Sequence, residues 1–336
     1  MTTTAAHRRG LARWRPALLA AMLAPAAQGA SAGALQYCTG PVGESAARQG
    51  QLLVLAAQVK QALAEAGEPV ALLSRSGLDL SRFGQVYSHA GLALRDSANS
   101  PWSVRQLYFA CAEGQSRVFD EGLAGFVRGA GAAERPRIAL VLLPPAAGAA
   151  LAAAALDNRR ALALLHPRYS ANAHAYSTLY QNCNQWVAEL MATAWAAPAA
   201  AASAPALANT AAATPPMSAP AAPRPRSAPV ASRAAAQAWL RAQGYQPVLF
   251  QAGPWRGLSL FSPYLHEDDH PPEAAARGEQ AVSMPASLEA WVQRQWPGAR
   301  RLEWCLSGHR VVARSGWQPL DDACQPGPGD QVHSLR

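Results

Sequence analysis

The sequence predicts an α+β protein with an antiparallel sheet, and three observations carry this prediction. A long segment over residues 43–67 places apolar residues at helical spacing, several short apolar or alternating runs follow it, and two further helical segments come after those runs. Helices that stand before and after a group of strands are typical of α+β folds, whereas parallel sheets alternate strand and helix.

Each expected element has a local signal. Gly67 ends the first helical pattern, as a glycine just past the last periodic residue does. The polar residues 96–101 separate two strand patterns and predict a hairpin. The expected elements are, in order, a helix over 43–67, strands over 69–75, 84–95, 102–113 and 136–145, and helices over 146–165 and 182–195.

Composition divides the chain into segments. Residues 197–232 are rich in Ala, Pro and Ser and have no apolar period, which predicts a flexible or semi-extended linker. Residues 33–196 before it are long enough for one compact core. Residues 233–336 after it form either a separate C-terminal module or the completion of the same fold.

The first 32 residues have the order of a secretory signal peptide, with a basic segment, the apolar run 17–27 and then small residues. Ala30-Ser31-Ala32 fits the small-x-small cleavage pattern, which places the mature N-terminus near Gly33. The apolar run is too short to span a bilayer, and no later stretch replaces it. We therefore expect an exported protein, periplasmic or extracellular, with no stable transmembrane anchor after cleavage.

The net charge does not indicate nucleic-acid binding. The chain carries a formal charge of +8, but four arginines lie in the first 32 residues without any acidic residue, so the remainder carries +4. The other arginines are scattered, with no basic helix and no interleaved aromatic residues of the kind a nucleic-acid surface uses. We expect no nucleic-acid partner.

Five cysteines in an exported chain leave at least one without a partner in the same chain. Cys38 and Cys111 are candidates for one disulfide, and Cys305 and Cys324 for a second, which leaves Cys183 free. Spacing alone does not choose among the other pairings.

No metal or cofactor site is expected. The cysteines lack the short spacing of a zinc knuckle, and "HEDDHPP" lacks the helical His spacing of metalloproteases. We interpret its polar residues as an exposed acidic loop; they are His266, Asp268, Asp269 and His270.

Cys183 stands where a polar loop turns into an amphipathic helix. Backbone N–H groups and the positive end of the helix dipole favour a thiolate there, so we expect a depressed pKa for Cys183 that depends on a nearby imidazole. A nucleophilic cysteine also needs an imidazole to move protons, and the best one is His89 on an expected strand, followed by two small residues. A hairpin turn near residues 98–99 would place Tyr108 opposite His89 and Gln106 on the same face, so either could orient the ring.

The same residues also have structural interpretations. Cys183 precedes an apolar stripe of the last helix, so it could be a core thiol, and His89 could be a half-buried strand histidine. His174 is interpreted as a loop residue. The remaining polar residues around Cys183 either cap the helix and order the loop or stabilise an oxyanion; they are Gln181, Asn182 and Asn184.

Two resemblances rest on these motifs. "SHAGLAL" at 88–94 and "YQNCNQWV" at 180–187 resemble the His-first, Cys-last order of circularly permuted NlpC-type papain-like proteins, which include lecithin retinol acyltransferase relatives. "RSGLDLSRFGQVYSHAGLALRDSANSPWSVRQLYFAC", "FDEGLAGFV", "VLLPP" and "YSANAHAYSTLYQNCNQWVAELMA" look like the bacterial family catalogued as domain of unknown function 2145, over most of residues 35–196. "AAAQAWLRAQGYQPV" continues that resemblance past the linker.

The papain-like resemblance implies a permuted papain-like fold for residues 33–196, with Cys183 as nucleophile and His89 as base. The chain departs from the acyltransferases after the cysteine, where Asn184-Gln185 replace an acidic residue and His. The second family brings no established activity.

The expected function is an exported cysteine-dependent amidase, peptidase or acyltransferase that acts on an amide or ester in the bacterial envelope. Its expected substrates are cell-wall peptides, lipids or lipoproteins, by analogy from compartment and fold. The alternative is a non-catalytic envelope binding or assembly protein on a papain-like scaffold.

Overall fold

The computed structural model describes residues 44–196, 232–253 and 262–335. The expected signal peptide, residues 1–32, lies outside them, as does the expected linker except for Ser232. The elements are α2 (Ala46–Ala66), β1 (Val70–Arg75), η1 (Ser81–Phe83), β2 (His89–Leu94), β3 (Ser103–Ala110), β4 (Gln115–Glu121), α3 (Leu123–Arg128), β5 (Arg137–Leu142), α4 (Pro145–Leu156), α5 (Asn158–Ala163), α6 (Cys183–Ala196), α7 (Arg233–Ala242), β6 (Val248–Gln251), α8 (Pro272–Ala276), β7 (Glu279–Val282), α9 (Pro285–Gln295), β8 (Arg300–Ser307), β9 (Arg310–Ser315) and β10 (Gln331–Ser334).

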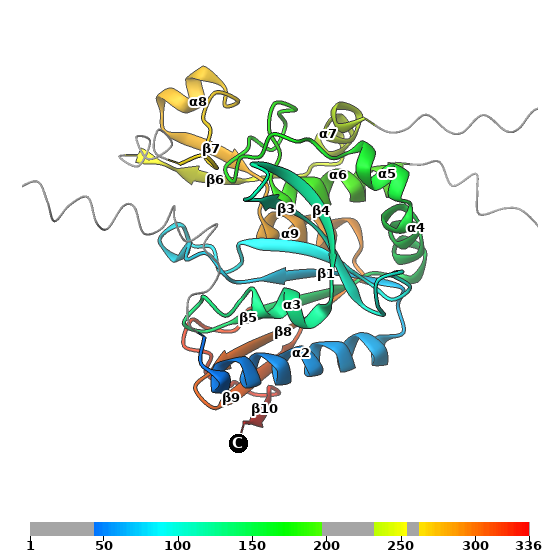
Figure 1. The fold of residues 1–336 in the computed structure, drawn as a ribbon, viewed down its shortest axis with the longest axis vertical. Coiled ribbons are helices and arrows are strands. Elements are labelled where there is room, and N and C mark those ends of the chain that lie inside the picture. Colours follow the sequence, from blue (N-terminus) through cyan, green and yellow to red (C-terminus); the bar gives the residue numbers. More distant parts are fainter. Residues whose placement is uncertain (1–43, 197–231, 254–261, 336) are drawn as a thin grey trace, which may run out of the picture. The chain divides into compact units, whose positions relative to one another are not determined.

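An eight-stranded sheet organises the fold, with strand order β10-β9-β8-β5-β1-β2-β3-β4. Every pairing in it is antiparallel, so the predicted α+β class with an antiparallel sheet is confirmed. Strands β6 and β7 form a separate two-stranded sheet (Figure 1). The large sheet places residues that are far apart in the chain on neighbouring strands.

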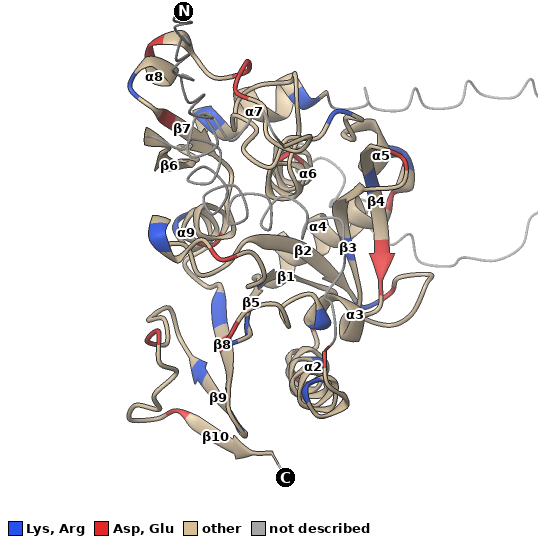
Figure 2. Cartoon of the chain, turned by 60° about the vertical axis from the view of Figure 1, so that its left-hand side comes forward, with Lys and Arg blue, Asp and Glu red and all other residues tan. Residues whose placement is uncertain are grey.

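Helices cover both faces of the sheet. Alternate residues of β1, Ala71 and Leu73, pack in one cluster with Leu52 and Leu55 of α2 and Phe126 of α3. Helices α4 and α6 contact β2 from the other face, and Figure 2 shows α2 and α3 on one side of β1 and β2 with α4 and α6 on the other. Strand alternation therefore decides which helix layer each side chain of β1, β2 and β3 meets.

The residues after 232 extend the same sheet. Ser232 caps α7 by accepting a hydrogen bond from Ala235 N–H at 3.2 Å. Further along, β8 pairs with β5 from Arg137↔Cys305 to Leu142↔Arg300, and β9 and β10 follow β8 outward. The C-terminal strands thus supply three of the eight strands, and the other five come from the N-terminal elements.

Two local differences from the expected elements have simple causes. The expected helix over 146–165 is divided at Asp157, whose extended backbone breaks α4 and whose carboxylate accepts from Arg160 N–H at 3.2 Å to begin α5. Strand β4 and helix α3 were not predicted. The polar sequence of β4 alternates only weakly, and its pairing with β3 along seven residues supplies what its own pattern lacks.

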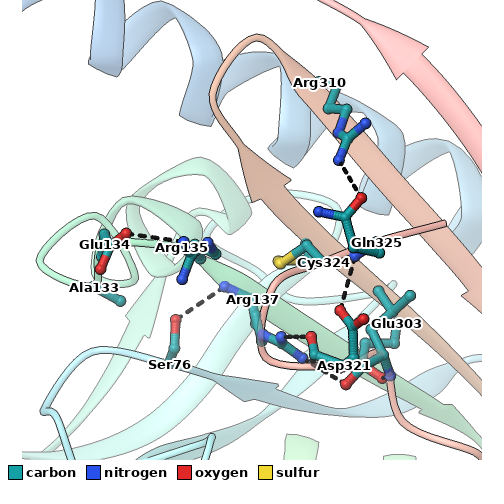
Figure 3. Close-up of a disulfide and its surroundings, with 12 residues drawn as sticks. Ser76, Ala133, Glu134, Arg135, Arg137, Glu303, Arg310, Asp321, Cys324 and Gln325 are labelled. Atoms are coloured by element: carbon teal, nitrogen blue, oxygen red, sulfur yellow. Dashed lines mark hydrogen bonds and ion pairs between the residues drawn. A yellow bond between two sulfur atoms is a disulfide. The ribbon is translucent and has the colours of Figure 1, made fainter.

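The disulfide Cys305–Cys324 is confirmed, and Figure 3 shows Cys324 close to the buried residues around Arg137. The pairing Cys38–Cys111 lies partly outside the described residues, because Cys38 is not among them; Cys111 is disulfide-bonded. Cys183 is free and buried. Among the helices of the described residues, none has the length and apolar character needed to cross a membrane.

Candidate functional site

The candidate site begins at the first turn of α6. Asn182 caps this helix, since its Oδ1 accepts from Gln185 N–H at 2.7 Å and its carbonyl accepts from Trp186 N–H at 3.2 Å. Cys183 is therefore the first helical residue, as the sequence predicts. Its own N–H and that of Asn184 belong to the first turn, whose first N–H groups have no partner within the helix.

A buried network fixes the approach to this helix. Gln181 donates from Nε2 to Glu189 at 2.6 Å, and its Oε1 accepts from His166 N–H at 2.9 Å. Glu189 also forms an ion pair with Arg233 of α7 at 2.9 Å. Gln181 and Asn182 thus hold the loop and the helix start in place. These contacts agree with the interpretation that Gln181 orders the loop and Asn182 caps the helix.

His89 is the first residue of β2, and its ring meets two side chains of β3. The β2–β3 register, Leu92↔Arg105 and Leu94↔Ser103, extends to place Tyr108 opposite His89. The two rings lie edge to face with centroids 5.5 Å apart, as the hairpin geometry predicts. Side chains alternate between the two faces of β2, and His89 shares the face of Ala93, which packs with α3. The His89 ring therefore lies 5.9 Å from that of Phe126.

Gln106 fixes the tautomer of His89. Its Oε1 lies 2.5 Å from His89 Nε2, while its Nε2 donates to the carboxylate of Glu121 at 2.6 Å. A carboxylate only accepts, so the amide oxygen must face His89, and His89 Nε2 must carry the proton. The lone pair is therefore on Nδ1. The glycine opposite Gln106 permits this contact, since a Cβ on Gly91 would lie 3.3 Å from that of Gln106 and 2.6 Å from Val104.

The Cys183 thiol approaches β2 from the α6 side, next to His89. The backbone N–H groups of Asn184 and of Ala90, the residue after His89, act to lower the pKa of Cys183. Asn184 tightens the same junction, because its Nδ2 donates to Ser88 O at 3.4 Å. Its Oδ1 is buried without a hydrogen-bond partner in the described residues. Cys183 thus lies on the α6 side of the start of β2, whereas the His89 ring lies on the α3 side of the same strand.

Burial raises the pKa of Cys183 to about 11, so the expected depressed pKa is wrong. The charge of Arg75 and the backbone N–H groups act in the opposite direction but are outweighed, because the side chain is only 5% exposed. Burial also lowers the pKa of His89 well below its usual range, with a further lowering by Arg75, while the Gln106 bond raises it. Thiol and imidazole are both neutral at neutral pH.

Arg75 is a site residue that the sequence analysis did not identify. It pairs with His89 across β1 and β2, and its guanidinium lies 5.5 Å from the Phe126 ring. It donates from Nη1 to Gly129 O at 2.7 Å, whereas its Nε is buried without a partner. Among the described residues, Arg75 forms no ion pair, although its side chain is 7% exposed.

Arg75 and Glu121 carried weak sequence signals. Arg75 ends an apolar strand run at the position that the hairpin pairs with His89, so register alone points to it. Glu121 ends β4, which was not predicted, so nothing in the sequence analysis placed it beside Gln106.

The acidic loop is exposed only in part: Asp268 is exposed as expected, whereas two of its neighbours are not. The side chains of His270 and Asp269 are 1% and 0% exposed, because the loop folds back onto residues 172–174. His174 is 5.3 Å from His270 between ring centroids, and His266 stacks on Tyr180 at 4.4 Å. In the described ranges, no group of three or more His, Cys, Asp or Glu side chains could hold a metal ion.

Comparison with known proteins gives one match. A family model described as "Uncharacterized protein conserved in bacteria (DUF2145)" matches residues 62–292, from the last part of α2 to α9. The matched range includes the first turn of α6 and the β2–β3 hairpin. No curated protein and no solved structure matches the chain.

Proposed function

Because the chain belongs to this bacterial family, whose description names no activity, we propose its function from the site: a cysteine-dependent hydrolase or acyltransferase with Cys183 as nucleophile and His89 as base. One observation carries the proposal. The Glu121–Gln106–His89 chain leaves the lone pair of His89 on Nδ1, and Asn184, the residue after Cys183, bonds the residue before His89. A base, its orienting group and a free thiol at a helix start are the parts that thiol-dependent acyl transfer needs.

Neutral groups can perform this chemistry. As the Cys183 sulfur attacks the carbonyl carbon, an S–C bond forms, the thiol proton moves to His89 Nδ1 and the carbonyl π electrons move to oxygen. The N–H groups of Cys183 and Asn184 stabilise that oxyanion. When it collapses, the C–N or C–O bond breaks and His89 returns the proton to the leaving group. Water or another nucleophile, deprotonated by His89, then releases the acyl group from sulfur.

The fold type and compartment belong to the same proposal. A strand histidine and a helix-start cysteine in His-first, Cys-last order support a permuted papain-like arrangement, and the substrate would be an envelope amide or ester. Disulfides at Cys305–Cys324 and Cys111 support an oxidising, exported location. Cell-wall peptides, lipids and lipoproteins are the substrate classes that this location offers.

The direct test is to trap the acyl-enzyme. The protein is mixed with p-nitrophenyl acetate at neutral pH, nitrophenolate release is followed, and the mass of the Cys183 peptide is measured after acid quench. We expect one acetyl group on Cys183 and none in Cys183→Ala, with acetylation slowed by about 100-fold or more in His89→Ala. His309→Ala is the matched control, since His309 lies in the exposed β8–β9 turn. Equal acetylation of the wild type and His89→Ala would contradict the proposal.

A second candidate, a non-catalytic envelope binding or assembly protein, is favoured by the burial of the pair. Cys183 and His89 are 5% and 6% exposed, and the raised pKa of Cys183 keeps the thiol protonated. A thiol that stays unacetylated and inert to iodoacetamide until denaturant is added would support this candidate over the enzyme.

A further inference from the structure

The guanidinium of Arg75 is the part of the site that the proposed chemistry does not use. Its side chain is 7% exposed, yet its Nε has no partner and no carboxylate of the described residues neutralises it. A buried cation without a counter-charge is costly, so proteins usually pair it or fill its site with a ligand.

The backbone around Arg75 is shaped to hold this guanidinium. A Cβ at Gly129 would lie 2.6 Å from its Cζ, and a Cβ at Gly77 would lie 2.8 Å from its Nη1. A side chain at either position would have to displace the guanidinium, so the two glycines leave room for it. Phe126 supports one face of the group at 5.5 Å, and Gly129 O holds Nη1 at 2.7 Å. These contacts fix the fork while leaving donors uncommitted.

The position of Arg75 links it to the nucleophile. It is the direct cross-strand partner of His89, so the two side chains project from the same face of neighbouring strands. Its charge also acts on Cys183 strongly enough to oppose the effect of burial on that pKa. Arg75 therefore lies within electrostatic reach of both partners of the candidate pair.

We propose that Arg75 binds a carboxylate of the substrate, so that the acyl compound carries a free carboxylate a few bonds from the carbonyl that Cys183 attacks. A guanidinium fork with uncommitted donors matches a carboxylate, which accepts two parallel hydrogen bonds. A peptide that is cleaved near its C-terminus has this arrangement. The inference rests on the proposed function and names its substrate class.

Two alkylating reagents of nearly equal size test this without a known substrate. Iodoacetate and iodoacetamide both form an S–CH2 bond with Cys183 and release iodide, but only iodoacetate carries a carboxylate. The ratio of their labelling rates at Cys183 is divided by the same ratio for 2-mercaptoethanol, which has no binding site. We expect a preference for iodoacetate of about tenfold or more, the size of one charge-assisted hydrogen bond.

Arg75→Gln should bring that preference to about one, while Arg117→Gln, which removes an exposed guanidinium from β4, should leave it unchanged. Loss of Arg75 also raises the pKa of Cys183, which slows both reagents, and the ratio cancels that effect. No preference in the wild type, or an undiminished one in Arg75→Gln, would overturn the inference.

A measurement on the wild type alone covers the case in which Arg75→Gln does not fold. Acetate should slow iodoacetamide labelling of Cys183, whereas acetamide at the same concentration and ionic strength should not. Equal effects of the two compounds would overturn the carboxylate site. If iodoacetamide labels Cys183 in a way that depends on His89, but iodoacetate is not preferred, only the carboxylate site is contradicted. If Cys183 reacts with neither reagent, the proposed function is contradicted as well.

Discussion

Two buried guanidinium clusters lie on the same sheet and differ in how their charge is neutralised. Glu303 of β8 is completely buried, and Arg137 and Arg301 approach its two oxygens at 3.3 and 2.9 Å. Tyr87 donates to the same carboxylate at 2.6 Å, and Leu320 N–H does so at 2.9 Å. Figure 3 shows Arg137 and Glu303 side by side next to Cys324. This cluster is complete within the protein.

The cluster of Arg75 is incomplete. Its guanidinium contacts one ring and two backbone carbonyls and has no carboxylate partner among the described residues, and it adjoins a thiol and an imidazole that are both neutral. A buried charged group is therefore not, by itself, evidence of a functional site. A cluster whose charges are satisfied within the protein stabilises the fold, whereas one that leaves donors unpaired beside a nucleophile can bind a ligand.

The largest effect is expected from Glu303→Gln, which would leave Arg137 buried without a counter-charge and Arg301 with Glu289 as its carboxylate partner. We expect a loss of about 3 to 5 kcal/mol in the free energy of unfolding, measured by urea denaturation. Glu134→Gln is the matched control, because Glu134 is an exposed partner of Arg135 and should change stability by less than about 1 kcal/mol. A loss of less than about 1 kcal/mol in Glu303→Gln would contradict the view that this carboxylate stabilises the fold.

Gln106→Ala tests whether the second cluster serves chemistry. It removes the acceptor that orients His89 Nε2–H and should slow acetylation of Cys183 by about 100-fold, the lower end of what general-base catalysis contributes. It also lowers the pKa of His89 further, since the Gln106 bond raises it. Gln115→Ala, on β4, is the control and should react at the wild-type rate. An unchanged rate in Gln106→Ala would mean that His89 needs no orienting group.

The pH dependence of stability probes the same imidazole. Burial lowers the pKa of His89 below its ordinary 6.5, so the unfolded chain binds its proton first as pH falls. Stability is therefore full above pH 6.5 and declines as pH falls from there towards the folded pKa. His89→Gln should reduce that decline by up to about 1.4 kcal/mol per pH unit, read from urea midpoints. Parallel profiles for the wild type and the variant would show that His89 titrates normally.

The smallest effect is expected on the stability of Arg75→Gln, and it sharpens the contrast with Glu303. The substitution loses a hydrogen bond to Gly129 O but also removes an uncompensated buried charge, so unfolding free energy should change by about 1 kcal/mol or less. Urea denaturation at neutral pH measures it directly. A loss as large as that of Glu303→Gln would mean that Arg75 is a structural residue with a partner in the fold.

The sequence predicted the parts of the site that depend on local pattern. Hairpin spacing placed Tyr108 opposite His89 and Gln106 on the same face, and the polar-to-apolar transition placed Cys183 at a helix start. These predictions succeed because register and helix position follow from residues close in the chain. They did not extend to Glu121, since β4 is stabilised by its pairing with β3 rather than by its own pattern.

The local pattern of the sequence was sufficient to predict the α+β class and the hairpin around His89, and it offered Cys305–Cys324 as one of several possible disulfides. Tertiary packing places β5 between β1 and β8, leaves Arg75 without a counter-charge among the described residues, and keeps the Cys183 thiol neutral. The physical reason is that desolvation and charge compensation depend on everything packed around a group, and most of those neighbours are distant in the chain.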